Sequence, residues 1–484
     1  MKKLIYIVFL CMAFLYGCSE DTMDEINHNP NNPTNVSSSL MMTNVIVGTL
    51  FNVTDGDYSF YSSVYTEQAV GCHGQMYAAE IRTTQPVSAT TYNNTWNGVY
   101  GYMYDLKLVM EKCKEGGTEE GNYHTLGIAQ ILTAYNLATL TDMTGDVPYS
   151  EAMQPGVIYQ PKLDSQEDLY KEVISLLNAG IDNLSKTEVS YPALGKQDPV
   201  YAGNSDLWKK TAYGLLARYT LRLAIANDGL YTNILEYIGN SYKKASEECK
   251  LNFDKIGGKN SHYAFLKDRN DLAASGSFHD LMIKHADPRK DMLFRSSNSD
   301  PVVFAKNGDP DELGAIQDVF GISALVTKNS PTILLSLDEL YFIKAEALAR
   351  KNSNNEARTE LIKAVRAAYG KIAPILNDAF KLPDDDYFNN IGKDKEGAEL
   401  IKEIMYQKYV AAFEFNSVEA YNDIRRYCAI EKKDIPDYIE LKHPHPEKFP
   451  VRFTYGNSDV TTNPNVYKAY GSVNVYQDKI WWAQ

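Results

Sequence analysis

The sequence predicts a mostly α-helical protein in which helical pairs form one large lobe and a loop-rich second lobe folds against it. Two observations support this class. Apolar residues recur with helical spacing in several segments between residues 165 and 368. Long connections rich in Gly, Asn and Asp separate such segments, at 54–98, 253–332 and 371–395. Connections of this length in a folded protein are usually functional or packed as a lobe of their own.

We expect the first helix of the fold over residues 36–52. Later helices are predicted by apolar stripes over residues 169–184, 208–223, 337–348 and 357–368. Ser165 followed by Asp168 is typical of a helix start, and Ser336 with Glu339 predicts a capping box for the third stripe.

The last two stripes predict a helical hairpin with small residues at the crossing. These residues are Ala345, Ala347, Ala349, Ala357 and Ala364. Because small side chains let helices approach closely, the pair resembles a tetratricopeptide unit in architecture, although the full consensus of that repeat is absent.

The N-terminus predicts a lipoprotein signal. Met1 is followed by two lysines and an apolar run over 4–15, which is too short for a permanent membrane helix. The run ends at Cys18, after Gly17, and this ending resembles a bacterial lipobox, from which Tyr16 departs. We therefore expect a signal peptide over 1–17, lipidation of Cys18 and a lipid-anchored tether over 18–35. The alternative is an ordinary signal peptide with an incidental cysteine.

Composition narrows the function classes. The net charge of −14 argues against nucleic acid as a partner, because nucleic-acid binding needs a basic surface. The 35 tyrosines suit sugar recognition, since each offers an apolar face and a polar tip, but a helical core could also use them. Cys72, Cys113, Cys249 and Cys428 are too far apart in sequence for a zinc motif, so a disulfide or buried thiols both remain open.

Several motifs along the chain resemble the SusD/RagB family of nutrient-binding outer-membrane lipoproteins. They are NPNNPT at 29–34, TGDVPYSEA at 144–152, DPR at 287–289, QKY at 407–409, EAYNDIRR at 419–426, and TTNPNV at 461–466 followed by Trp481 and Trp482. The sequence departs from the family pattern at Tyr409 and Tyr421, where the family has Trp, and it lacks an Asp after Trp482.

The resemblance implies a SusD-like α-α superhelix whose nutrient-binding domain covers 36–484. It implies a surface-exposed protein that binds an oligosaccharide without catalysis and delivers it to a SusC-like TonB-dependent barrel. A RagB-like peptide receptor and a helical-repeat scaffold for other proteins are the alternatives. The motif residues themselves predict structure: internal ion pairs for Arg425 and Arg426, and a chain end pinned by Trp481 and Trp482.

No motif predicts catalysis or a cofactor. The sequence has no G-x-S-x-G, H-E-x-x-H or phosphate-binding glycine loop, so we expect no enzyme and no cofactor. NGDPDELG at 307–314 offers oxygen atoms to calcium but lacks EF-hand spacing, so we interpret it as a solvated turn and expect no metal.

Ligand contacts are expected in the tyrosine-rich connection at 54–98 and near 275–279. Tyr77 and Arg82 lie outside helical stripes and are the first candidates. Trp96 and Phe278 are further candidates, although Trp96 forms a helical stripe with Tyr100 and Tyr104 that also suits a core. Tyr58, Tyr61 and Tyr65 have the same spacing and are predicted to be core residues.

Overall fold

The computed structural model describes residues 36–83, 87–253, 258–269, 271–296, 301–310 and 319–484. The predicted signal peptide, lipidated Cys18, the tether and the NPNNPT motif lie outside the described residues, and so do residues 311–314 of the predicted turn.

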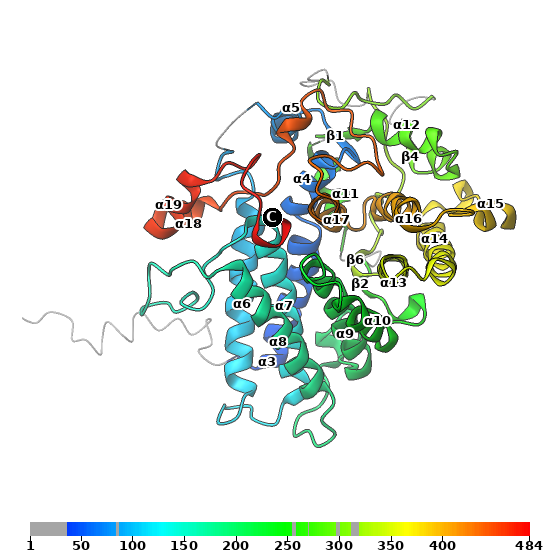
Figure 1. Cartoon of the computed structure of the whole chain (residues 1–484). Coiled ribbons are helices and arrows are strands. Elements are labelled where there is room, and N and C mark those ends of the chain that lie inside the picture. The colour runs from blue at the N-terminus through cyan, green and yellow to red at the C-terminus, as the bar shows by residue number, and fades with distance from the viewer. Residues whose placement is uncertain (1–35, 84–86, 254–257, 270, 297–300, 311–318) are drawn as a thin grey trace, which may run out of the picture.

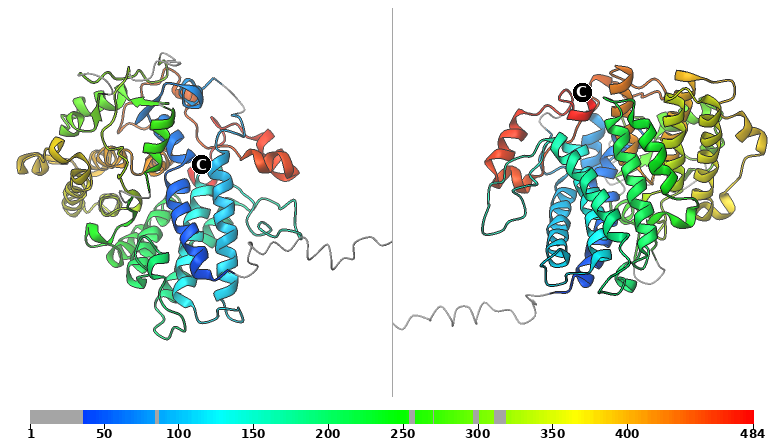
Figure 2. Two further views of the ribbon diagram at one scale, coloured as in Figure 1. Left: turned by 180° about the vertical axis from the view of Figure 1, so that it is seen from behind. Right: turned by 60° about the horizontal axis from the view of Figure 1, so that its bottom comes forward.

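Long antiparallel helices dominate the molecule (Figure 1), which confirms the predicted class. The helical lobe consists of α3 (Ser38–Gly48), a π-helical turn (Thr49–Thr54), α6 (Asn93–Cys113), α7 (Tyr123–Thr144), α8 (Gln166–Leu184), α9 (Ser205–Leu223), α10 (Leu230–Asn240), α13 (Leu337–Arg350), α14 (Asn354–Leu376), α15 (Asp385–Asn390), α16 (Gly397–Ala412) and α17 (Ser417–Glu431). Successive helices pack as pairs, α6 on α7, α7 on α8, α9 on α10 and α13 on α14. The pairs follow one another around the molecule (Figure 2).

The predicted helices are present. Of the two helix starts that the sequence predicts, the structure confirms one and not the other. Ser165 caps α8, because its hydroxyl accepts a hydrogen bond from the Asp168 N–H at 3.2 Å. The predicted capping box at Ser336 is wrong. The Ser336 side chain makes no capping bond, and the Leu337 N–H donates to Glu248 Oε1 at 3.0 Å. The Glu339 carboxylate instead accepts a hydrogen bond from the Arg218 guanidinium at 2.6 Å, and a charge-assisted bond of this kind is stronger than a capping bond.

The loop-rich lobe lies over one side of the helices and contains short elements. They are α4 (Asp57–Tyr65), α5 (Gly74–Ile81), α11 (Ser261–Arg269), α12 (Gly276–Lys284), β1 (Ala69–Gly71), β2 (Cys249–Leu251), β3 (Leu272–Ala274), β4 (Phe294–Arg295), β5 (Ile322–Ser323) and β6 (Thr332–Leu335). The strands pair antiparallel as β1–β3, β2–β6 and β4–β5. The connection at 54–98 is thus largely helical. Its tyrosines on α4 are buried as predicted: Tyr58, Tyr61 and Tyr65.

The C-terminal segment returns to the core after α18 (Asn457–Thr462) and α19 (Pro464–Ser472). Trp482 is buried, and its indole N–H donates to Asp142 Oδ1 at 2.8 Å, so it pins the chain end as predicted. Trp481 remains 38% exposed, and its ring lies at a tilt to that of Tyr170, with the ring centres 6.2 Å apart. The end of the chain lies over α17 (Figure 1).

Two further sequence questions are answered by the described residues. No disulfide joins Cys72, Cys113, Cys249 and Cys428, which are all buried. None of the helices that the structure describes combines the length and the apolar character needed to cross a bilayer.

Candidate functional site

A pocket of about 370 Å³ opens where the C-terminal segment meets α17. Its size falls within the range of small-ligand sites in proteins. The end of α17, the chain that follows it and the C-terminal segment form its walls. The lining residues are Ile424, Arg425, Cys428, Lys433, Asp434, Pro446, Glu447, Phe449, Val451, Tyr476, Gln477, Lys479 and Ala483.

Two aromatic rings and several polar side chains give this pocket its chemistry. Tyr476 is partly exposed, and Phe449 is more deeply buried and stacks on Tyr421 with a ring separation of 5.7 Å. Gln477 contributes an exposed amide. A ring face combined with planar hydrogen-bonding groups is what a sugar ring requires, since its C–H faces are apolar and its hydroxyls are polar.

The floor of the pocket is rigid because Arg425 is locked in place. Its Nη2 donates to the Asp142 carbonyl at 2.7 Å and its Nη1 to the Val451 carbonyl at 3.1 Å. The guanidinium also lies 4.2 Å from the centre of the Tyr421 ring and 4.9 Å from that of Trp482. Arg425 is thus internal, as predicted, but it binds mainly carbonyl oxygens where ion pairs were expected.

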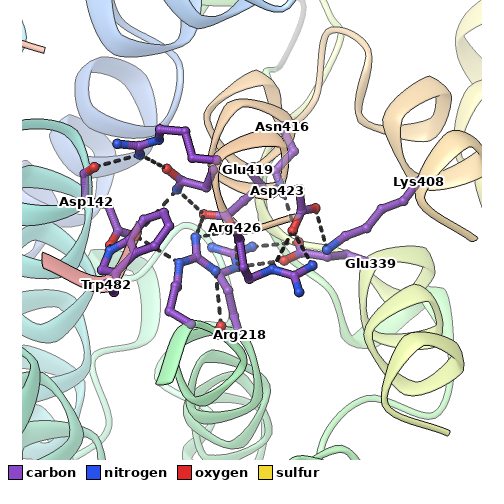
Figure 3. Close-up of polar contacts among 12 residues, drawn as sticks. Asp142, Arg218, Glu339, Lys408, Asn416, Glu419, Asp423, Arg426 and Trp482 are labelled. Atoms are coloured by element: carbon purple, nitrogen blue, oxygen red, sulfur yellow. Dashed lines mark hydrogen bonds and ion pairs between the residues drawn. The ribbon is translucent and has the colours of Figure 1, made fainter. Parts of the chain in front are cut away.

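Beneath the floor, a network of buried ion pairs joins α17 to α7, α9 and α13, and Lys408 of α16 enters it through Asp423 at 2.7 Å (Figure 3). Arg426 of α17 donates to both carboxylate oxygens of Glu346 on α13, at 2.7 and 2.6 Å, and also pairs with Asp423. This confirms the internal pairing predicted for Arg426. Burial alone would raise the pKa of Glu346, but the guanidinium groups of Arg426 and Arg350 hold it well below its usual range.

The same network continues to α9 and α7. Arg222 donates to both oxygens of Glu419, at 2.7 and 2.6 Å, and pairs with Asp142 at 3.2 Å. Arg218 binds Glu339 at 2.6 Å. Because these pairs of Arg218 and Arg222 cross between helices, the network fixes α17, and with it the pocket floor, relative to α7, α9 and α13.

The predicted contact residues are not gathered at one place. Tyr77 lies partly exposed on α5. Trp96 is fully buried and donates to Asp459 at 2.6 Å, and Phe278 is buried against Tyr409 and Phe413. In this conformation Trp96 and Phe278 pack the core and present no face to solvent, and their contact with a ligand stays a prediction.

Arg82 is also buried, and its guanidinium lies near one of the pocket residues. Its Nη2 donates to the Tyr65 carbonyl at 3.2 Å, and its guanidinium lies 5.9 Å from the ring centre of Phe449, a pocket residue. None of the four predicted residues is among the described residues that line the pocket. Sequence reasoning missed Phe449 and Tyr476 because both lie in irregular chain, where no periodicity marks a residue.

Chemistry other than binding finds no support among the described side chains. Burial raises the pKa of the Cys428 thiol to about 12, so this pocket residue is a neutral thiol at physiological pH. No group of three or more His, Cys, Asp or Glu residues in the described ranges is arranged to hold a metal ion.

Comparisons with known proteins assign the chain to a family. A SusD-like family model, described as starch-binding and associating with the outer membrane, matches residues 30–455. A crystal structure of a SusD/RagB family protein from Bacteroides thetaiotaomicron has a TM-score of 0.84 and 34% identity, covering 93% of this chain and 99% of the other. No curated protein matches the sequence.

More distant structures share the fold alone. A SusD homolog from Bacteroides fragilis has a TM-score of 0.74 at 18% identity, covering 93% of this chain and all of the other. A chitin-binding SusD homolog from Flavobacterium johnsoniae has a TM-score of 0.71 at 18% identity, covering 92% and 98% of the two chains.

Proposed function

The chain belongs to the SusD-like family of non-catalytic, outer-membrane nutrient-binding proteins, and from that premise we propose that it captures an oligosaccharide at the cell surface. It would be held there by lipid on Cys18 and would pass its ligand to a SusC-like TonB-dependent barrel. The single observation that carries the ligand class is the pocket beside the C-terminus, where the partly exposed ring of Tyr476 lies among polar side chains.

Binding would rest on stacking and on hydroxyl contacts. A sugar face would lie on Tyr476, with Phe449 deeper in the wall, and Gln477 would contact ring hydroxyls. Each ring would contribute about 1–2 kcal/mol. The isolated protein would therefore bind in the micromolar to millimolar range, and enclosure by the barrel would add avidity. The chitin-binding relative makes amino-sugar oligomers a sensible first series.

A peptide is the second candidate ligand, and a specific feature favours it. Charged side chains of both signs border the pocket, Lys433 and Lys479 against Asp434 and Glu447. Such a rim suits the two charged ends of a short peptide better than it suits a neutral sugar.

Calorimetry on the protein lacking residues 1–18 tests the ligand. We expect a neutral oligosaccharide series to include a binder, and Tyr476→Ala to weaken that binder about tenfold or more. Tyr467→Ala is the matched control, since Tyr467 is 64% exposed on α19 and is not among the described pocket residues. If defined peptides bind and no glycan does, the oligosaccharide proposal fails and the peptide proposal replaces it. An equal loss in both variants would remove the pocket from the proposal.

The anchor and the partner have their own tests. Cys18→Ala should abolish lipid labelling and membrane attachment, and unchanged attachment would contradict the anchor.

Detergent extraction of the native protein should recover it in complex with a barrel of the SusC type, and the interface between the two should be larger than the standard size. Recovery of the protein alone, or with soluble proteins on its concave face, would favour the helical-scaffold alternative.

A further inference from the structure

A buried carboxylate fixes the chain that leads into the pocket wall. Glu67 follows α4, and its two carboxylate oxygens accept hydrogen bonds from the Lys442 N–H at 2.8 Å and the His443 N–H at 2.9 Å. The Ser277 hydroxyl donates to the same carboxylate at 2.7 Å. Residues 446–449, which begin the pocket wall, follow directly.

Glu67 holds this position at a conformational cost. Its φ angle is +61°, in the left-handed region that a residue with a side chain rarely adopts. Strain of this kind persists where surrounding contacts enforce it, and it gathers at functional sites. Glu67 is almost completely buried, and its three hydrogen bonds offset the cost of its burial and of its backbone conformation.

Glu80, a second buried residue, binds the same chain segment through its backbone carbonyl, while its carboxylate holds the neighbouring loop at Gly308. Glu80 of α5 accepts from the Gly308 N–H at 2.6 Å and from the Gly71 N–H at 3.0 Å. The Glu80 carbonyl accepts from His443 Nε2 at 2.7 Å. Gly308 also packs closely on residues 443 and 444, because a Cβ atom placed there would overlap Pro444 and His443.

His443 is held in one neutral form between these partners. Its Nε2 donates to the Glu80 carbonyl, so its Nδ1 accepts the hydrogen bond of the His445 N–H at 3.0 Å. Burial first, and then the nearby charge of Arg82, lower the pKa of His443 to about 4. The 442–449 segment therefore has one fixed position, set by Glu67 and Glu80.

We infer that Glu67, Glu80 and His443 form a latch that positions the 442–449 segment and so sets the ligand affinity of the C-terminal pocket. The effect on ligand affinity rests on the proposed function, whereas the position of the 442–449 segment does not. Glu67 is a positioning residue in it, since it is separated from the pocket by the chain that it holds. Arg82 belongs to the same arrangement, because its guanidinium lies 5.9 Å from the ring centre of Phe449.

Burial of the Glu80 carboxyl makes the latch sensitive to pH. Burial raises the pKa of Glu80 to about 7, the Gly308 hydrogen bond and Arg82 oppose that rise, and Glu67 adds to it. His443 stays neutral here, and Cys72 is a buried neutral thiol with a raised pKa. Because the folded state favours neutral Glu80, the stability it contributes is complete below about pH 4.5 and is lost as pH rises through 7. Affinity should therefore fall from pH 6 to pH 8, and this dependence should disappear in Glu80→Gln.

Glu67→Gln tests the latch through amide exchange and affinity together. The Lys442 and His443 amides should exchange at least tenfold faster, because the carboxylate that protects them is gone. Ligand affinity should fall about tenfold while the tryptophan environment near Trp482 stays unchanged. Glu111→Gln is the matched control, since Glu111 is a half-exposed carboxylate that pairs with Lys114. Unchanged amide exchange in Glu67→Gln would overturn the latch.

A second variant guards against misfolding of the first. Gly308→Ala forces the 305–308 loop away from Pro444, and the positive φ of +76° at Gly308 adds strain, without any change of charge. We expect the same faster exchange at residues 442 and 443 and the same loss of affinity. Faster exchange with unchanged affinity would keep the latch as a local structure but overturn its control of the pocket. If the wild-type protein binds no glycan or peptide at all, the proposed function fails, and the exchange results still decide whether the latch exists.

Discussion

In the helical lobe, charged side chains of opposite sign meet across helices, whereas in the loop-rich lobe carboxylates bind mainly backbone N–H and hydroxyl groups. The ion pair of Arg426 and Glu346 is an example from the helical lobe. In the loop-rich lobe, Glu67 binds the His443 N–H, and Glu80 binds the Gly308 N–H. Helices satisfy their own backbone, so their side chains are left to join one helix to the next. Irregular chain has unpaired N–H groups, and buried carboxylates supply the missing acceptors.

The floor and the wall of the pocket are therefore held in place by different kinds of interaction. Its floor is part of α17 and is held by ion pairs within the helical lobe. The chain that leads into its wall at 446–449 is held at Lys442 and His443 by the Glu67 carboxylate and the Glu80 carbonyl. Substitutions in the first set should change the stability of the whole fold, and substitutions in the second should change local structure and affinity.

Glu346→Ala should have the largest effect. It leaves Arg426 and Arg350 buried without Glu346, and among the described residues Asp423 and Glu431 are their remaining ion-pair partners. Removing one member of a buried ion pair typically costs about 3–5 kcal/mol of the free energy of unfolding. Urea denaturation measures the loss.

Asp385→Ala is the matched control for Glu346→Ala. Asp385 pairs with Arg366, and both side chains are well exposed, so we expect a loss of at most about 1 kcal/mol. Equal losses in the two variants would contradict the claim that burial gives the helical network its importance.

His262→Gln should have an intermediate effect, because His262 joins the two lobes by charge. Its Nε2 lies 2.9 Å from Asp55 and its Nδ1 2.8 Å from Glu414. Burial would lower the pKa of His262, but Asp55 and then Glu414 raise it to about 10, so the ring is an imidazolium at neutral pH. We expect a loss of about 2 kcal/mol at pH 7.

The pH dependence identifies the cause of that loss. The stability from His262 is complete below about pH 6.5 and is lost as pH rises through 10. Urea midpoints at pH 7 and pH 9.5 should therefore differ in the wild type and should differ less in His262→Gln. Parallel midpoints in both proteins would show that the charge on His262 does not stabilise the fold.

The sequence predicted the helical lobe well because its signals are local. Periodicity located α8, α9, α13 and α14, and the motif around Arg426 predicted an internal ion pair that the structure contains. Even the tyrosines of α4 were predicted as core residues from spacing alone.

The pocket could not be predicted in the same way. Phe449 and Tyr476 line the same pocket, and the chain before Phe449 is bound at Lys442 by Glu67, which lies 375 positions earlier in the sequence. A hydrogen bond to a backbone N–H leaves no trace in the identity of the donor residue. Arg82 was predicted as a ligand contact because it lies outside the helical stripes. The structure places it in a buried position near Phe449, and its contact with a ligand stays a prediction.

Two serine variants give the smallest and most discriminating test, because both serines carry the same sequence signature of a helix start. The Ser165 hydroxyl accepts a hydrogen bond from the Asp168 N–H and donates one to the Asp168 carboxylate at 2.8 Å. Ser165→Ala should therefore lower the free energy of unfolding by about 1 kcal/mol. Ser336 makes no capping bond, and Glu248 serves the first turn of α13 in its place. Ser336→Ala should therefore change the free energy of unfolding by less than about 0.5 kcal/mol. Urea titrations of the two variants beside the wild type resolve this difference. If Ser336→Ala costs as much as Ser165→Ala, then Ser336 caps α13 in solution and the capping box that the sequence predicts is restored.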